Sequence, residues 1–195
     1  MPRSGERSNL LVMIRRLVVL VGILATAGCS ATQLAPAQSE NVVDTVTMGS
    51  LRTAALRYPS AFDVTIGRPV RTDQTSSFDF IYTTDLLGRH LLLPLHAITG
   101  LGNTTGSNPG FIRSTGSFTQ LTNAPTDNYL TTDTLVIAAG DVFVLRSRVA
   151  CYLGVPQYGK LHVLDFNDAL QTVRFEVLSD INCGYKNLEP GIPTT

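Results

Sequence analysis

The sequence predicts an all-β domain: an antiparallel β-sandwich, or a partly open barrel, of about eight strands. Beyond Tyr58, short runs of β-branched and aromatic residues are separated by clusters of Gly, Pro, Asn and Asp. No long helical pattern appears, and strands do not alternate with helices as a parallel sheet would require. The chain has 195 residues, of which 44% are hydrophobic and 15% charged, and this length suffices to bury a core.

The clearest strand signal is an alternation in which Phe78, Phe80 and Tyr82 occupy every second position, as expected of a strand with one face in a core. The other strand candidates are residues 61–66, 89–96, 111–119, 129–138, 141–150, 158–166 and 171–179. Residues 42–58 mix apolar positions with Thr, Gly and Ser, so we expect a strand or irregular structure there.

The first 28 residues predict a cleaved signal peptide. Arg15 and Arg16 precede an apolar run, residues 17–25, which small residues follow. A positive segment, a short apolar run and small residues are typical of a secretion leader, whereas a spanning helix needs about 20 apolar residues. An uncleaved anchor is the less favoured alternative, and a start at Met13 would give a more compact leader.

The small residues Ala27 and Gly28 directly precede Cys29, and this pattern resembles the lipobox of bacterial lipoproteins, although Thr26 stands where leucine is commonest. The resemblance implies that Cys29 is lipidated and becomes the mature N-terminus. The Ser30 that follows resembles the pattern sorted to the outer membrane. We therefore expect a protein of the bacterial cell envelope that is lipid-anchored and faces the periplasm or the cell surface, with the outer membrane favoured.

Small polar residues with one proline follow the cysteine and predict a flexible tether. The chain then divides into a leader (1–28), a lipidated cysteine with its tether (29–41) and a β-sandwich domain (42–195). The full chain is formally neutral, but removing the leader takes four of 15 basic and one of 15 acidic residues, which leaves a net charge of −3. This domain lacks the basic excess that nucleic-acid binding needs, so we expect no nucleic-acid partner.

With Cys29 assigned to lipidation, Cys151 and Cys183 are the only remaining cysteines. In an oxidising compartment they predict a disulfide, and a loop of this length should stabilise the fold by about 3–4 kcal/mol. The alternative is two free thiols or a redox pair, which the missing C-x-x-C spacing disfavours.

The three histidines, His90, His96 and His162, are the only candidates for metal or haem ligation and for acid–base work near neutral pH. His90 and His96 share one predicted strand and one face, but they would lie about 20 Å apart and so not share a metal. His162 alternates outward with Lys160, which predicts a solvated face. Structural or surface roles are favoured for all three histidines, with ligand roles as the alternative.

Catalytic patterns are weak. There is no G-x-S-x-G elbow, and no free cysteine in a catalytic setting. Two carboxylate pairs, Asp79 with Asp85 and Asp165 with Asp168, have the residue types of glycoside hydrolysis, but the second pair more simply frames a hairpin turn. We expect the protein not to be an enzyme, and an envelope hydrolase is the least favoured alternative.

A glycine-rich stretch between Gly100 and Gly110 is the candidate binding loop. Its candidate contact residues are Gly102, Asn103, Thr104, Thr105 and Asn108. The glycine spacing is not that of a dinucleotide fingerprint and no helix follows, so the stretch predicts a long exposed loop. Long loops on rigid scaffolds often bind partners.

The segment Tyr158–Val163, a turn and then Thr172–Glu176 resembles the closing hairpin of secreted bacterial β-sandwich lipoproteins, including the HmuY-like haem-binding group. That group holds haem with a histidine pair, which no histidine here matches. The leading hypothesis is a non-enzymatic, lipid-anchored protein that binds a partner or serves as an accessory subunit of an envelope complex. A small-ligand carrier, with haem as the named cofactor, is the alternative.

Overall fold

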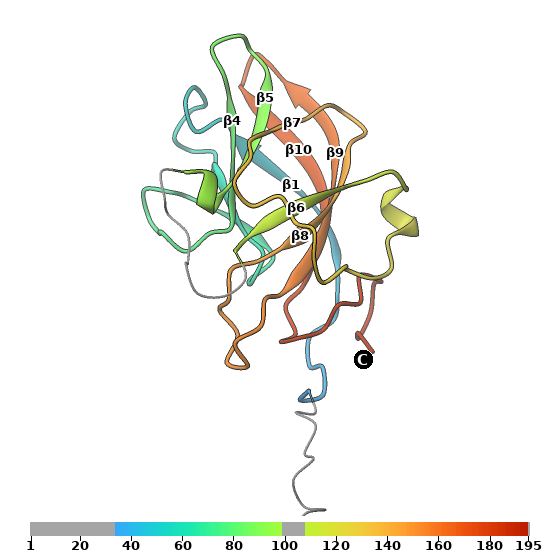
Figure 1. Cartoon of the computed structure of the whole chain (residues 1–195). Coiled ribbons are helices and arrows are strands. Elements are labelled where there is room, and N and C mark those ends of the chain that lie inside the picture. Colours follow the sequence, from blue (N-terminus) through green and yellow to red (C-terminus); the bar gives the residue numbers. More distant parts are fainter. Residues whose placement is uncertain (1–33, 99–107, 195) are drawn as a thin grey trace, which may run out of the picture. The chain divides into compact units, whose positions relative to one another are not determined.

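The computed structural model describes residues 34–98 and 108–194. Their ten strands form two open, five-stranded antiparallel sheets that pack as a sandwich (Figure 1). In spatial order, the first sheet holds β1 (Val43–Gly49), β10 (Thr172–Asp180), β9 (Tyr158–Asn167), β8 (Val142–Arg146) and β6 (Gly110–Ser114). The second sheet holds β3 (Arg68–Val70), β2 (Ala61–Asp63), β4 (Phe80–Thr84), β5 (His90–Pro94) and β7 (Leu135–Val136). The predicted sandwich is confirmed, and the barrel alternative is not adopted.

Several predicted strands are shorter than expected. The stretch 129–138 pairs as a strand only at β7, and 111–119 divides into β6 and a 3-10 helix, η2 (Phe118–Gln120). A second 3-10 helix, η1 (Leu95–Ala97), takes His96 out of β5. The strand β3 was not predicted; it contains Pro69, which lacks an N–H and is tolerated because β3 is an edge strand. Within the described ranges, neither helix is long and apolar enough to cross a membrane.

The main core lies between the two sheets and is built on aromatic contacts. The rings of Phe62 and Phe80 stack with centroids 5.3 Å apart, and Phe80 meets Phe111 of the other sheet edge-on at 5.1 Å. All three side chains are at most 1% exposed. Offset and edge-to-face packing of this kind fixes the two layers against each other.

Part of the outer face of the first sheet is covered as well, which corrects the prediction of a solvated face at Lys160 and His162. Lys160 is only 2% exposed, and its ammonium donates to the carbonyls of Phe118 and Leu121, both at 2.9 Å. His162 is half-buried near the Phe118 ring. Period-two alternation identifies the face of a strand, but it does not show that a distant segment covers that face.

The predicted tether is wrong for residues 35–41, which are fixed to the domain. The backbone N–H groups of Gln38 and Ser39 both donate to Asn182 Oδ1 at 3.0 Å. Asn41 pairs with Gly191 through two backbone hydrogen bonds of 2.8 and 3.0 Å. The compact unit accordingly begins at Leu34 and not at residue 42. The small polar composition of this segment predicted a free chain. The prediction failed because the partners of the segment lie near the other end of the sequence and no local pattern shows them.

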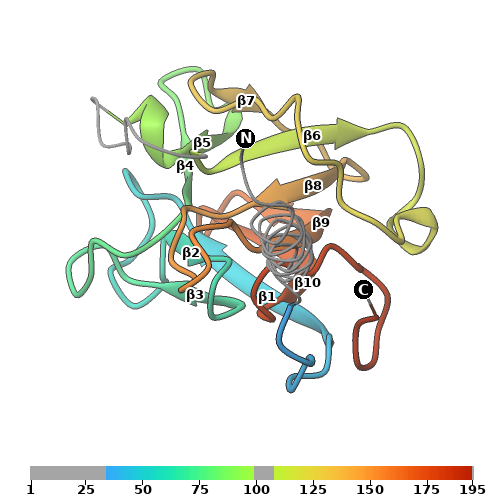
Figure 2. The same ribbon diagram turned by 60° about the horizontal axis from the view of Figure 1, so that its bottom comes forward.

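The two ends of β10 locate the two ends of the sandwich. Its nine residues span roughly 30 Å. We call the end with residues 50–58, 85–89 and 168–171 the loop end, and the end with residues 35–41, 147–157 and 180–191 the base (Figure 1). Figure 2 brings the base forward and shows the N-terminal segment, the loop after β8 and the C-terminal tail gathered there.

Candidate functional site at the base

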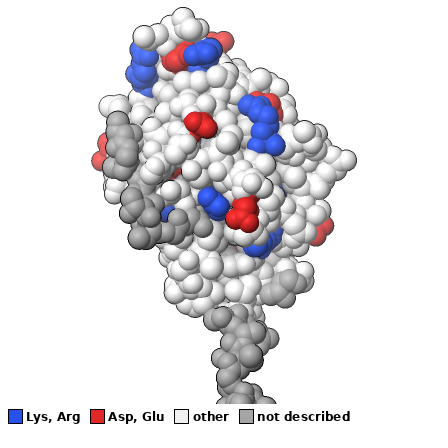
Figure 3. Space-filling view, in the orientation of Figure 1, with Lys and Arg blue, Asp and Glu red and all other residues white. Residues whose placement is uncertain are grey.

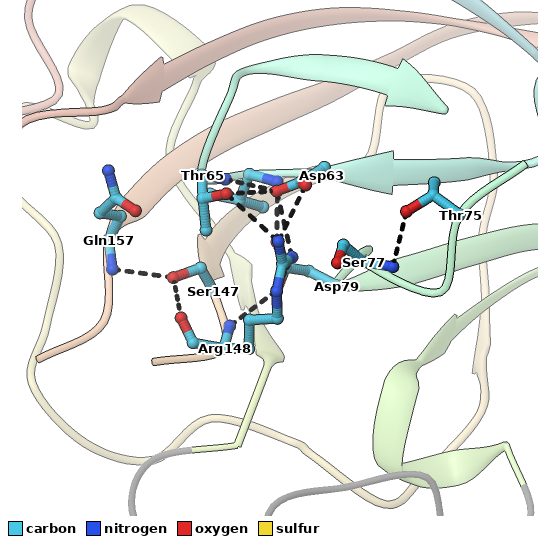
Figure 4. Close-up of polar contacts among 9 residues, drawn as sticks. Asp63, Thr65, Thr75, Ser77, Asp79, Ser147, Arg148 and Gln157 are labelled. Atoms are coloured by element: carbon cyan, nitrogen blue, oxygen red, sulfur yellow. Dashed lines mark hydrogen bonds and ion pairs between the residues drawn. The ribbon is translucent and has the colours of Figure 1, made fainter. Parts of the chain in front are cut away.

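A buried ion cluster joins the two sheets near the base. Arg148 follows β8 of the first sheet, whereas Asp63 lies in β2 and Asp79 directly before β4 of the second. The guanidinium contacts Asp63 at 2.9 and 3.1 Å and Asp79 at 3.2 Å (Figure 4). Both carboxylates are at most 3% exposed. One side chain therefore ties a loop of the first sheet to two strands of the second.

Backbone groups complete this cluster. Asp79 accepts hydrogen bonds from the N–H groups of Val64 and Arg148, each at 2.7 Å. Burial raises the pKa of Asp79 to about 6, although Arg148 opposes the shift. Burial also opposes the charge of Arg148, but the hydrogen bond to Asp63 and the charge of Asp79 outweigh it and raise the pKa of the guanidinium. The two carboxylates thus act as acceptors that hold the cluster together.

Thr65 connects the cluster to a surface cleft. Its hydroxyl donates to Asp63 Oδ1 at 2.6 Å and accepts from Arg148 at 3.3 Å (Figure 4). The same residue lines a cleft of about 590 Å³ at the base. The described lining is uncharged and includes Gln38, Tyr152, Gln157 and the Cys151–Cys183 disulfide. Its chemistry is therefore that of amides, hydroxyls and an aromatic face, which suits a neutral polar ligand.

The disulfide closes one side of the cleft. Cys151 and Cys183 are bonded, as predicted, with Cα atoms 5.7 Å apart. The bond links the loop after β8 to the residues that follow β10. Beside it, the Gln157 side chain donates to the carbonyl of Ile181 at 2.5 Å, and Tyr152 remains 76% exposed. The wall of the cleft is covalently fixed, while Tyr152 is free to meet a ligand.

The histidines lie elsewhere. His90 has its Nδ1 2.7 Å from the Tyr82 hydroxyl and its Nε2 3.4 Å from Asp168, and its ring stacks on Phe166 at 3.7 Å. Burial lowers the pKa of His90, and Asp168 opposes the shift. His162 Nδ1 lies 3.3 Å from Glu176. In the described part of the chain, no three His, Cys, Asp or Glu side chains are placed to hold a metal.

Asp79 and Asp85, the first candidate pair of catalytic carboxylates, do not lie together, because they stand at opposite ends of β4. Asp79 shares Arg148 with Asp63, whereas Asp85 binds Arg89 at 2.6 Å. Asp165 in β9 forms an ion pair with Arg174, and Asp168 lies in the turn between β9 and β10. Asp79, Asp85 and Asp165 therefore each pair with an arginine, and Asp168 lies 3.4 Å from His90 Nε2.

The structure describes only part of the candidate binding loop. Gly102, Asn103, Thr104 and Thr105 lie outside the described residues, as does Cys29. Asn108 is described, and its carbonyl accepts a hydrogen bond from Arg146 at 3.0 Å.

Sequence reasoning missed Arg148, Asp63 and the fixed N-terminal segment. No local signal was available, because the alternation that places Phe78 and Phe80 in the core places Asp79 on the opposite face of the strand. Comparisons with known protein families, with curated proteins and with solved structures found no match to this chain.

Proposed function

We propose that the protein is a lipid-anchored, non-enzymatic protein of the bacterial cell envelope that works by binding a partner. One observation carries the proposal: the N-terminal segment is fastened to the base almost immediately after the lipobox-like motif. Leu34, where the compact unit begins, is only five positions after Cys29. Five residues span at most about 18 Å. A lipid on Cys29 would therefore hold the base close to the membrane.

The base is built to withstand such an attachment. The disulfide and the Arg148 cluster fix the loops of the base, and the hydrogen bonds that Gln38 and Ser39 donate to Asn182 join the N-terminal segment to those loops. The uncharged cleft lies among these elements and supports binding in preference to catalysis. A haem carrier is the weaker candidate, because both ring nitrogens of His90 already face polar partners.

Labelling of the full chain in a bacterial host tests the anchor. We expect the wild type to incorporate radiolabelled palmitate, to be found in the membrane fraction and to accumulate as a larger precursor when globomycin blocks lipoprotein signal peptidase. Cys29→Ala should lose the label. Cys151→Ala serves as the matched control and should keep it. An unchanged precursor size under globomycin, or a Cys29→Ala chain that remains membrane-bound, would contradict the proposal.

A further inference from the structure

The loop end is a rigid platform made of three loops from both sheets. Ser50 and Thr84 share a hydrogen bond of 3.0 Å between their hydroxyls. Thr53 and Thr84 both donate to the side-chain carbonyl of Gln171, at 2.9 and 3.1 Å. These contacts join the segment after β1, the β4–β5 hairpin and the β9–β10 turn. The platform therefore holds these three loops in place relative to one another.

Leucines cover the outer side of this platform. Leu86 and Leu87 form the tip of the β4–β5 hairpin and are 85% and 80% exposed. Leu56 is 81% exposed, and Leu51 and Leu170 are 46% and 42% exposed. Leu86, Leu56 and Leu87 are the three most exposed large apolar side chains of the described residues, whereas Leu130, Tyr152 and Ile181 are exposed elsewhere. A single exposed leucine is ordinary, but a concentration at one end indicates an interaction surface.

Arginines accompany these leucines. Arg52 directly follows Leu51, Arg57 directly follows Leu56, and Arg89 comes two positions after Leu87. All three arginines are exposed, and Arg89 is oriented by Asp85 at 2.6 Å. Figure 3 shows basic and acidic atoms next to one another at the upper end of the molecule, with uncharged surface around them. The loop end thus presents apolar side chains together with three arginines and two carboxylates, those of Asp85 and of the exposed Asp168.

We propose that the loop end binds the surface of an anionic phospholipid bilayer. Leu86 and Leu87 enter the headgroup region, and the nearby arginines contact lipid phosphates. The shape of the hairpin tip favours a bilayer over a protein groove. Leu86 and Leu87 are adjacent in the chain and both protrude into solvent, and a fluid bilayer can adapt its shape to two protruding side chains. The inference goes beyond the proposed function and does not depend on the anchor at Cys29.

The natural chain contains no tryptophan, so one introduced indole reports its own surroundings. We would use the full mature chain, residues 29–195, carrying Cys29→Ser so that no lipid is attached. Leu86→Trp places the reporter at the hairpin tip, and Tyr152→Trp places a matched reporter on the exposed surface of the base. With vesicles of phosphatidylglycerol and phosphatidylcholine, the emission of Leu86→Trp should shift to the blue and be quenched by brominated lipid. The emission of Tyr152→Trp should not change.

Sedimentation with the same vesicles tests the leucines and the charges separately. Changing both Leu86→Asp and Leu87→Asp should weaken vesicle binding by tenfold or more, on the order expected from the apolar area lost. Leu130→Asp, which alters an exposed leucine elsewhere, should leave binding unchanged. The pair Arg52→Gln and Arg57→Gln should weaken binding only to vesicles that contain phosphatidylglycerol. Unaltered Leu86→Trp emission, or equal binding by the double aspartate variant, would overturn the proposal while leaving the anchor at Cys29 untouched.

Discussion

The base and the loop end of the sandwich are organised in opposite ways. At the base the charges of Asp63 and Asp79 are buried and are paired with Arg148. At the loop end the charges and the leucines lie outside, and a network of hydroxyl and amide groups lies beneath them. The base therefore carries the interactions that hold the fold together, and the loop end is the part whose side chains can change without unfolding the domain.

Among changes at the two ends of the sandwich, the largest expected loss of stability comes from Arg148→Met. Removing the guanidinium leaves two buried carboxylates without their cation, so the free energy of unfolding should fall by about 3–5 kcal/mol. Chemical denaturation would measure it. Arg174→Met is the control, because its ion pair with Asp165 is exposed to solvent and should contribute little to stability. Equal losses in the two variants would remove the contrast between buried and exposed pairs.

Breaking the disulfide should have the next largest effect. The paired change Cys151→Ser and Cys183→Ser opens a loop with a sequence separation of 32, and it should lower the free energy of unfolding by about 3–4 kcal/mol. Thermal unfolding would show the loss. Vesicle binding by the folded variant should be unaffected, since the bond lies at the base. A parallel loss of vesicle binding would mean that the two ends are not independent.

Asn182→Ala tests how the N-terminal segment is held. The substitution removes the acceptor of the Gln38 and Ser39 N–H groups and the donor to the Ser39 carbonyl. We expect a loss of about 1–3 kcal/mol. Hydrogen exchange should rise at residues 37–41 and remain slow in β9. Uniformly faster exchange would show that the segment does not open separately from the sheet.

The raised pKa of Asp79 predicts a pH dependence of stability. The folded state binds this proton up to about pH 6, whereas the unfolded carboxyl loses it near its ordinary value of 3.8. The contribution of Asp79 is therefore fully present below pH 3.8 and is lost as the pH rises towards 6. Subtracting the unfolding curves of Asp79→Asn from those of the wild type should isolate this falling slope. A difference that rises with pH over the same range would contradict it.

The smallest effect on stability should come from the loop end. Leu86→Ser and Leu87→Ser should each change the free energy of unfolding by less than about 0.5 kcal/mol, because both side chains are already in solvent. Thermal unfolding would check this. Phe80→Ala provides the contrast: it removes a core ring that is 1% exposed, and it should cost about 3–5 kcal/mol. A large loss at Leu86 would place it in the fold and not in a contact surface.

Local patterns were sufficient to predict the fold class and the closing hairpin. The alternation through Phe80 and Tyr82 identified β4, and the runs around β9 and β10 were close to their observed bounds. The edge strand β1 was ambiguous, because its partner in the sheet is β10, more than 120 positions later in the chain. No local pattern contains that pairing.

The site at the base was predictable only in part. Compartment and cysteine count identified Cys151 and Cys183, since two cysteines allow one pairing. The Arg148 cluster forms only when three segments of the chain converge. Neither the sequence spacing of Asp63, Asp79 and Arg148 nor the pattern of charges along the chain predicts that they meet. The same limit applies to Lys160, whose carbonyl partners lie 39 and 42 positions away.

The attachment of the first described residues to the last has a consequence for the order of folding. Gln38 and Ser39 are synthesised early, yet Asn182, their partner, lies 144 and 143 positions later. Asn41 likewise awaits Gly191. The N-terminal segment therefore closes onto the domain only after residue 191 has been added to the chain. A chain truncated before Asn182 would lack these partners and would leave the segment open to proteases.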